Sequence, residues 1–188
     1  MIKYLCVTDL EATCWDNGNV GKRHEMETIE IGSVLINAET LQKVSEFQNF
    51  IKPVRNPVLS DFCKSLTTIT QDQVNGAESF PVVFTKWLNW MNQVDTPVLA
   101  SWGRYDYNQL LQDCTFHSIA FPFTDHVNIK NVVAEKMRWR PQGVSKALAR
   151  LGFKFEGTAH RGIDDARNIH RIIKKVYGGS EGKGIQLT

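Results

Sequence analysis

The stretch Tyr4-Leu-Cys-Val-Thr-Asp-Leu-Glu-Ala-Thr13 is a nearly continuous apolar run that ends in two carboxylates, Asp9 and Glu11. Such a run predicts a buried strand, and side chains two positions apart on a strand point to the same face. Asp9 and Glu11 are therefore expected to project together, and two like charges this close repel unless a cation lies between them. Mg²⁺ and Mn²⁺ bind carboxylate oxygens and keep positions open for water and a substrate phosphate.

An Asp-x-Glu pair on its own is weak evidence for a metal site. The chain holds 20 acidic residues among 188, so a chance match is expected in about one of two such chains. The pair gains weight only if further acidic residues lie at strand or helix ends downstream.

Length and composition indicate one domain with an ordinary hydrophobic core. The cysteines have no C-x-x-C or Cys/His ligand spacing, which predicts reduced, mostly buried thiols and argues against a zinc site; they are Cys6, Cys14, Cys63 and Cys114. The sequence has no charged-then-apolar leader, and no apolar run approaches the roughly 20 residues that span a bilayer. We expect a soluble, cytoplasmic protein with no membrane partner.

The charge is unevenly distributed along the chain. Net charge is only +2, but residues 128–175 hold twelve Lys and Arg against four Asp and Glu, so the remainder is net negative by six. Solvated helix faces are one explanation for such a segment. A surface that attracts a polyanionic substrate is the other.

Hydrophobic patterning predicts strands first and then alternating strands and helices. Strands are expected at 4–13, 28–37 and 41–52 as a meander, and later at 97–101 and 126–130. Helices are expected at 60–64, 70–74, 80–91, after Trp102, at 131–139, at 143–151 and at 161–177. The pattern indicates an α/β fold: a mixed sheet, antiparallel meander then parallel strands, flanked by helices. We expect a single domain over residues 1–178 and a flexible tail over 179–188.

Two acidic residues downstream lie at predicted helix starts, where they could join Asp9 and Glu11 in a metal site. Asp106 follows the strand 97–101 near a helix N-terminus, where the ionised form is favoured, and Gly103 lets the backbone approach a ligand. His160 lies five residues before Asp165 at the start of the last helix. We expect Gly162 to make the intervening loop flexible enough to bring His160 over the site.

Other candidates near the site have a plainer alternative. Glu27 or Glu30 could join a metal site, although an acidic residue on the outer face of an edge strand is the commoner case. Trp15, Trp102 and Trp139 lie in predicted loops, where they could contact bases.

Asp-x-Glu on the first strand, an Asp after a central strand and His-x₄-Asp at the last helix together resemble the DEDDh branch of the DnaQ-like 3′-5′ exonucleases, over roughly residues 3–177. Two stretches narrow the resemblance to the histone-mRNA 3′-end exonucleases, the enhanced-RNA-interference group. They are Asp9-Leu-Glu-Ala-Thr-Cys14 and Leu59-Ser-Asp-Phe-Cys-Lys-Ser-Leu-Thr-Thr-Ile-Thr-Gln-Asp-Gln-Val74. The resemblance implies an RNase H-like fold.

The resemblance also implies roles for individual residues. Two divalent ions, Mg²⁺ or Mn²⁺, would be held by Asp9, Glu11, Asp106 and Asp165. His160 would be the general base, with Glu11 also counted as catalytic. The pocket for the terminal nucleotide would be lined by Ala12, Thr13, Leu66 and Thr67. Asp164 is given no metal role. The sequence departs from the family at Thr68, where relatives often have Gly.

The function expected from the resemblance is metal-dependent removal of nucleoside 5′-monophosphates from the 3′ end of single-stranded nucleic acid. Likeness to an RNA-directed group favours RNA, but no residue distinguishes the sugars. Two alternatives stay open: a non-catalytic RNA-binding module of the same fold, and a phosphodiesterase for short oligonucleotides or dinucleotides. The sequence gives no oligomeric state.

Overall fold

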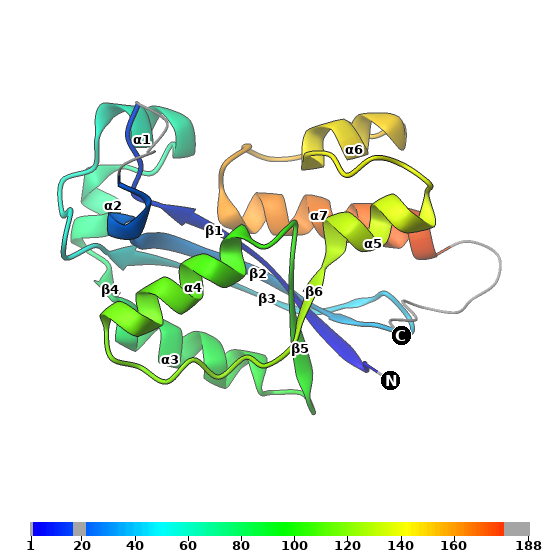
Figure 1. The fold of residues 1–188 in the computed structure, drawn as a ribbon, viewed down its shortest axis with the longest axis horizontal. Coiled ribbons are helices and arrows are strands. Elements are labelled where there is room, and N and C mark those ends of the chain that lie inside the picture. Colours follow the sequence, from blue (N-terminus) through cyan, green and yellow to red (C-terminus); the bar gives the residue numbers. More distant parts are fainter. Residues whose placement is uncertain (1, 17–21, 179–188) are drawn as a thin grey trace.

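The computed structural model describes residues 2–16 and 22–178 as one sheet with helices on both faces (Figure 1). The order of strands across the sheet is β4-β3-β2-β1-β5-β6. The strands are β1 (Tyr4–Ala12), β2 (Thr28–Asn37), β3 (Lys43–Lys52), β4 (Glu78–Ser79), β5 (Pro97–Ser101) and β6 (His126–Asn128). The predicted tail at 179–188 lies outside the described residues.

Seven α-helices and one short 3₁₀ helix connect the described strands. They are η1 (Arg23–Glu25), α1 (Asp61–Thr67), α2 (Gln71–Asn75), α3 (Phe80–Met91), α4 (Tyr105–Phe116), α5 (Ile129–Lys136), α6 (Val144–Arg150) and α7 (Gly162–Tyr177). The predicted mixed sheet is confirmed: β1, β2 and β3 pair antiparallel, and β5 and β6 continue the sheet in parallel with β1. The two-residue strand β4 was not predicted, because it is too short to carry a periodic pattern.

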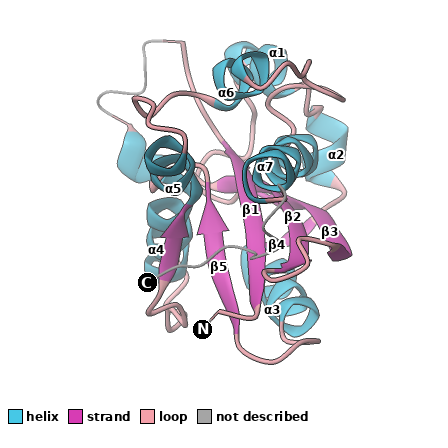
Figure 2. Cartoon of the chain, turned by 90° about the vertical axis from the view of Figure 1, so that its right-hand side faces the viewer, coloured by secondary structure: helices cyan, strands magenta, loops and turns pink. Residues whose placement is uncertain are grey.

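The two faces of β1 belong to different cores. Leu5 and Val7 pack in a cluster with α5, α6 and α7, whereas Cys6 and Leu10 pack in a cluster with α3 and α4. Figure 2 shows the sheet with α7 and α3 packed beside it. Because strand side chains alternate, Asp9 and Glu11 continue the face that α7 covers.

Helix α7 approaches the sheet closely because two glycines meet there. A Cβ on Gly32 would lie 2.0 Å from the backbone of Gly162, and a Cβ on Gly162 would lie 2.7 Å from the carbonyl oxygen of Asp9. Any side chain at either position would push the helix away from β1 and β2. The contact therefore fixes the first turn of α7 next to Asp9.

Helix boundaries shift from the predicted ones where a side chain caps the backbone. The strand expected over 126–130 ends at Asn128, whose Oδ1 accepts a hydrogen bond from the backbone N–H of Asn131 at 3.2 Å. An asparagine at this position begins a helix, so α5 starts at Ile129 rather than at 131.

The state of the cysteines and the character of the helices were both predicted from the composition. All four cysteines are free and buried, as predicted. Within residues 2–16 and 22–178, no helix has the length and apolar character needed to cross a membrane.

Candidate active site

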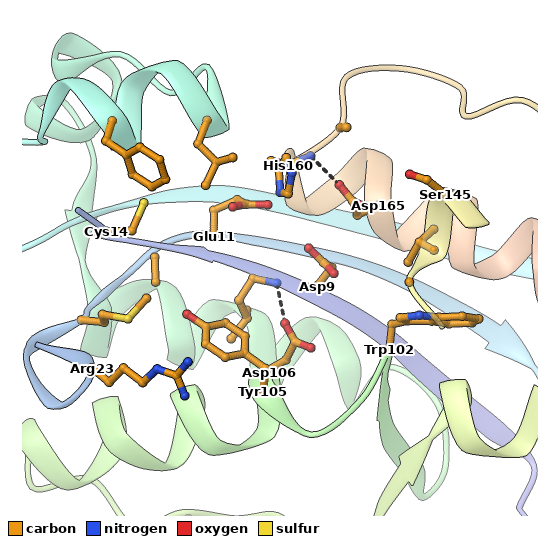
Figure 3. A pocket seen from close by; sticks show the side chains of 18 of the residues that line it. Asp9, Glu11, Cys14, Arg23, Trp102, Tyr105, Asp106, Ser145, His160 and Asp165 are labelled. Carbon is orange, nitrogen blue, oxygen red and sulfur yellow. Dashed lines mark hydrogen bonds between the residues drawn. The ribbon is translucent and has the colours of Figure 1, made fainter. Parts of the chain in front are cut away.

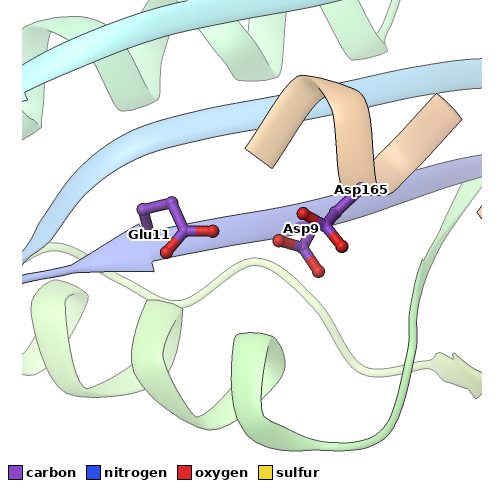
Figure 4. A group of neighbouring side chains, drawn as sticks. All are labelled: Asp9, Glu11 and Asp165. Carbon is purple, nitrogen blue, oxygen red and sulfur yellow. The ribbon is translucent and has the colours of Figure 1, made fainter. Parts of the chain in front are cut away.

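Three carboxylates from opposite ends of the chain converge at the end of β1. Asp9 and Glu11 project from the same face of β1, and Asp165 enters from the first turn of α7 (Figure 4). One oxygen from each lies within 4.8 Å of the others. The predicted pairing of Asp9 with Glu11 is thus confirmed, and the glycine contact between α7 and β2 explains how Asp165 reaches them.

The cluster is electrostatically unfavourable without a cation. Burial, then the charge of Asp106, raises the pKa of Asp9 well above its usual range, and burial followed by the charge of Asp165 does the same for the pKa of Glu11. Burial raises the pKa of Asp165 to about 6. Carboxylates buried together this way are stabilised by a bound dication, and an all-oxygen ligand set suits Mg²⁺ or Mn²⁺. The residues present therefore fit a divalent metal.

Asp106 lies at the same pocket but outside this group of three. It sits in the first turn of α4 and is buried, and its Oδ1 accepts the backbone N–H of Leu10 at 3.0 Å. Burial raises its pKa to about 6, while the hydrogen bond from Leu10 opposes the rise. The structure thus brings three of the four predicted ligands together and turns the fourth toward the backbone of β1.

His160 lies on an exposed loop directly before α7. Its backbone N–H donates to Oδ2 of Asp165 at 2.8 Å, and its φ of 61° is in the left-handed region (Figure 3). The loop is therefore tied to a carboxylate of the cluster. Gly162, expected to make this loop flexible, is buried and has a packing role instead, in the contact with Asp9 and Gly32 described above.

Asp164 anchors the other end of the His160 loop. Its Oδ2 accepts the backbone N–H of Thr158 at 2.9 Å, and its Oδ1 accepts from Arg167 at 3.0 Å. Gly157 has a φ of 86°, and a Cβ there would lie 2.5 Å from the Asp164 carboxyl group. Successive carboxylates of α7 thus hold the loop at two points, Thr158 and His160.

The placement expected for Glu27 and Glu30 on the outer face of an edge strand is wrong. Both are buried, and β2 is an inner strand. Glu30 forms a salt bridge with Arg161 at 3.0 Å, and Glu27 accepts the backbone N–H groups of residues 54–56 at 2.8–2.9 Å. Their charges are therefore compensated within the protein.

A pocket of about 710 Å³ contains the carboxylates. Ala12 and Leu66 line it, as the resemblance implied. The side chains of Thr13 and Thr67 do not: Thr13 accepts the backbone N–H of Glu27 at 3.0 Å, and Thr67 donates to the carbonyl oxygen of Cys63 at 2.9 Å. Their part in binding a nucleotide stays a prediction.

Several lining residues were not expected from the sequence. They are Leu10, Cys14, Arg23, Met26, Phe62, Tyr105, Gly143, Val144, Ser145, Lys146 and Ala159. Tyr105 adjoins Asp106, which is the one local signal that could have identified it. Trp15 and Trp102 line the pocket, whereas Trp139 packs beside the core under Arg150.

Thr68, where the resemblance leads us to expect Gly, has a backbone conformation that glycine adopts readily. It ends α1 with a φ of 61°. Glycine adopts this left-handed conformation without steric cost, so the substitution adds backbone strain and not a side chain in the pocket, since Thr68 is exposed and is not a lining residue.

Comparison with known proteins assigns the family. Residues 6–173 match the exonuclease family RNase_T. The chain belongs to this exonuclease family. It is 34% identical over 189 residues to human 3′-5′ exoribonuclease 1, covering 95% of this chain and 54% of that protein. It is 30% identical to the 3′-5′ exonuclease Snipper of Drosophila melanogaster, covering 92% of this chain and 69% of that protein.

A solved structure of the nuclease domain of 3′hExo, a DEDDh family member, bound to rAMP, matches this chain with a TM-score of 0.84 at 35% identity. The match covers 91% of this chain and 90% of that one. The full-length 3′-exonuclease matches with a TM-score of 0.85, and the chain covers 59% of it. The chain thus spans about half the length of the first relatives it matches and nearly all of an isolated nuclease domain. The predicted RNase H-like fold is confirmed.

Proposed function

We propose that the chain is a metal-dependent 3′-5′ exonuclease that releases nucleoside 5′-monophosphates from single-stranded RNA. The observation that carries the proposal is the convergence of Asp9, Glu11 and Asp165 within 4.8 Å beside His160, in a chain of the exonuclease family. RNA is chosen because the similar proteins include human 3′-5′ exoribonuclease 1 and a nuclease domain solved with rAMP bound.

The carboxylates would hold two Mg²⁺ or Mn²⁺ ions. Asp9, Glu11 and Asp165 would supply oxygen ligands, and Asp106, at the same pocket, is the fourth candidate ligand. Ions in such a site neutralise charge on the phosphate, activate water and support the leaving oxygen.

His160 would act as the general base. Imidazole is the side chain that exchanges protons near neutral pH, and its backbone link to Asp165 keeps the ring at the rim of the pocket. The ring would accept the proton of the attacking water and return it to solvent between turnovers.

The apolar part of the pocket would receive the terminal nucleoside. Ala12, Leu66, Met26 and Phe62 line it, and Tyr105 offers an aromatic ring beside them. An apolar enclosure excludes water and permits base stacking, so a single unpaired nucleotide would enter and a base pair would be excluded.

The cytoplasmic location stays a prediction from the cysteines.

The proposal is tested with a 5′-labelled RNA decamer and its DNA counterpart, each with a free or blocked 3′ end, and with an RNA dinucleotide. We expect stepwise shortening from the free 3′ end with Mg²⁺ or Mn²⁺, none with EDTA, and mononucleotide 5′-phosphates as products. Intact RNA under all conditions would contradict the proposal. RNA bound equally with EDTA and never cut would instead support the binding module, and cleavage confined to dinucleotides would support the short-substrate phosphodiesterase.

A further inference from the structure

The pocket has two unlike sides. Figure 3 shows Cys14 and Arg23 on one side of the carboxylates and Trp102 and Ser145 on the other. The first side continues into the apolar lining described above and holds one cation, Arg23. On the second side Lys146 lines the pocket, and Arg104 and Lys130 lie next to Gly103, the residue after Trp102. We call these three cations the cationic rim.

The cationic rim is built around Trp102. Lys146, next to Ser145, lines the pocket. The Lys130 Nζ lies 3.2 Å from where a Cβ would stand on Gly103, directly after Trp102. The indole N–H of Trp102 donates to the carbonyl oxygen of Gln142 at 2.8 Å, which ties the loop before α6 to this wall.

Arg104 completes the rim between Gly103 and the pocket residue Tyr105. It is exposed, and its guanidinium lies 4.7 Å from the ring centre of Tyr107. The ring holds the side chain in a defined place without neutralising it.

The three cations have no acidic partner. Within residues 2–16 and 22–178, none of the ion pairs includes Arg104, Lys130 or Lys146. Some other cations are paired, as in Arg167 with Glu46 at 2.6 Å and Arg171 with Glu156 at 2.7 Å, but most lysines and arginines of the described residues form no ion pair. The rim is distinguished by its position, because Lys146 lines the pocket and Lys130 lies against Gly103, next to the lining residue Trp102. Cations near an acidic cluster concentrate positive potential where a polyanion would pass.

We propose that the cationic rim binds the phosphates that lie 5′ of the scissile bond in single-stranded nucleic acid. The inference rests on the proposed function. The terminal nucleoside would fill the apolar side, its 5′ phosphate would lie at the carboxylates, and the strand would leave past Trp102 across the rim. Such contacts are independent of sequence, and a dinucleotide would be too short to use all three. The rim therefore gives this enzyme a preference for longer strands.

The test compares one triple variant with a matched control. Arg104→Gln, Lys130→Gln and Lys146→Gln together remove the rim charge. Lys3→Gln, Lys174→Gln and Lys175→Gln together remove the same charge at positions that do not line the pocket. Both variants and the wild type are assayed on an RNA decamer and a dinucleotide across a range of salt concentrations.

We expect the rim variant to raise KM for the decamer about tenfold or more, with a clearly smaller change on the dinucleotide, which is too short to use all three cations. The slope of log KM against log salt should fall by about 2, since each of three phosphate contacts contributes roughly 0.7. The control variant should match the wild type within about twofold. An unchanged KM for the decamer, or an equal loss on both substrates, would overturn the inference.

Failure of the proposed function would look different. If the wild type cut neither substrate, the exonuclease proposal would fail. Fluorescence anisotropy of a labelled decamer would still measure its affinity for the wild type and for the rim variant. Weaker binding by the variant would support phosphate binding at the rim, and equal binding would refute it.

Discussion

Glu11 and Glu30 face each other across β1 and β2 as register partners, yet the protein treats their charges differently. Both are buried, with 8% and 0% of their surface exposed. Glu30 is bound by Arg161, by the N–H of Gly162 at 3.2 Å and by Gln48 at 2.7 Å. Glu11 instead shares a small space with two more carboxylates. A buried carboxylate whose charge is compensated by groups of the protein belongs to the fold. Carboxylates that lie together without such compensation indicate a site for a metal cation.

The largest expected effect comes from Asp165→Asn, which removes charge from the uncompensated group. The amide oxygen can still accept the N–H of His160, so the loop should stay in place. We expect activity to fall about a thousandfold, the scale of lost charge stabilisation at an active site, with the metal-free protein at least as stable as the wild type. RNA cleavage and thermal unfolding in EDTA measure the two properties.

The Asp165→Asn variant also tests the metal. A ligand at 100 times its Kd stabilises the folded state by about 2.7 kcal/mol, so saturating Mn²⁺ should raise the Tm of the wild type. It should raise the Tm of the variant clearly less. An equal rise in both proteins would contradict the role of Asp165 as a ligand.

The second effect separates Glu11 from Glu30 directly. Glu30→Gln leaves Arg161, only 20% exposed, without its carboxylate, and breaking such a pair costs about 3 kcal/mol. Glu11→Gln relieves repulsion and should keep or increase stability in EDTA. Urea unfolding of both variants gives the two free energies. If Glu11→Gln lowered the free energy of unfolding as much as Glu30→Gln, the two glutamates would not differ in how their charges are compensated.

A smaller effect is expected at Asp164, whose carboxylate positions the His160 loop. Asp164→Ala removes the acceptor of the Thr158 N–H, and we expect kcat to fall about tenfold with KM unchanged, because misplaced catalytic groups lose rate. Asp164→Asn keeps an acceptor oxygen and should recover most of the rate. Steady-state kinetics on the decamer decide it: equal rates for Ala and Asn would remove Asp164 from the positioning of His160.

The smallest effect concerns Glu46, a compensated acid near the surface. Hydrogen bonding to Arg167 lowers the pKa of Glu46 from about 4.5 to about 2. A carboxyl pKa that is lower in the folded state contributes stability above the unfolded value, and this stability is lost as the pH falls toward 2.

Because Arg167 is 48% exposed, solvent screening limits the Glu46 contribution to about 1 kcal/mol. The difference in unfolding free energy between wild type and Glu46→Gln should be near that value at pH 7. It should shrink between about pH 5 and pH 2. A constant difference over this range would show that packing, not charge, accounts for it.

Local patterns predicted the parts of the site that depend on short spacings. The period of a strand placed Asp9 beside Glu11, and the five-residue spacing of His160 and Asp165 matches the hydrogen bond that joins them. The pairing of Glu30 with Arg161 was not predictable, since it joins residues 131 positions apart. Glu27 and Glu30 therefore could not be told from exposed acids without the tertiary fold.

The role of Gly162 also could not be predicted from the sequence, because it depends on the tertiary fold. A glycine in a loop suggests mobility, but Gly162 is needed because the backbone of Asp9 lies against it. The pocket-lining positions of Leu66 and Tyr105 likewise depend on where α1 and α4 pack. Sequence patterns predicted candidate site residues, while the close approach of elements decided which of them meet.

The glycine contact between α7 and the sheet also affects when the group of three carboxylates is assembled during synthesis. Asp9 and Glu11 leave the ribosome early, whereas Asp165 cannot join them until the last helix has emerged and docked against Gly32. The group of three carboxylates is therefore assembled only after the chain has been made as far as α7.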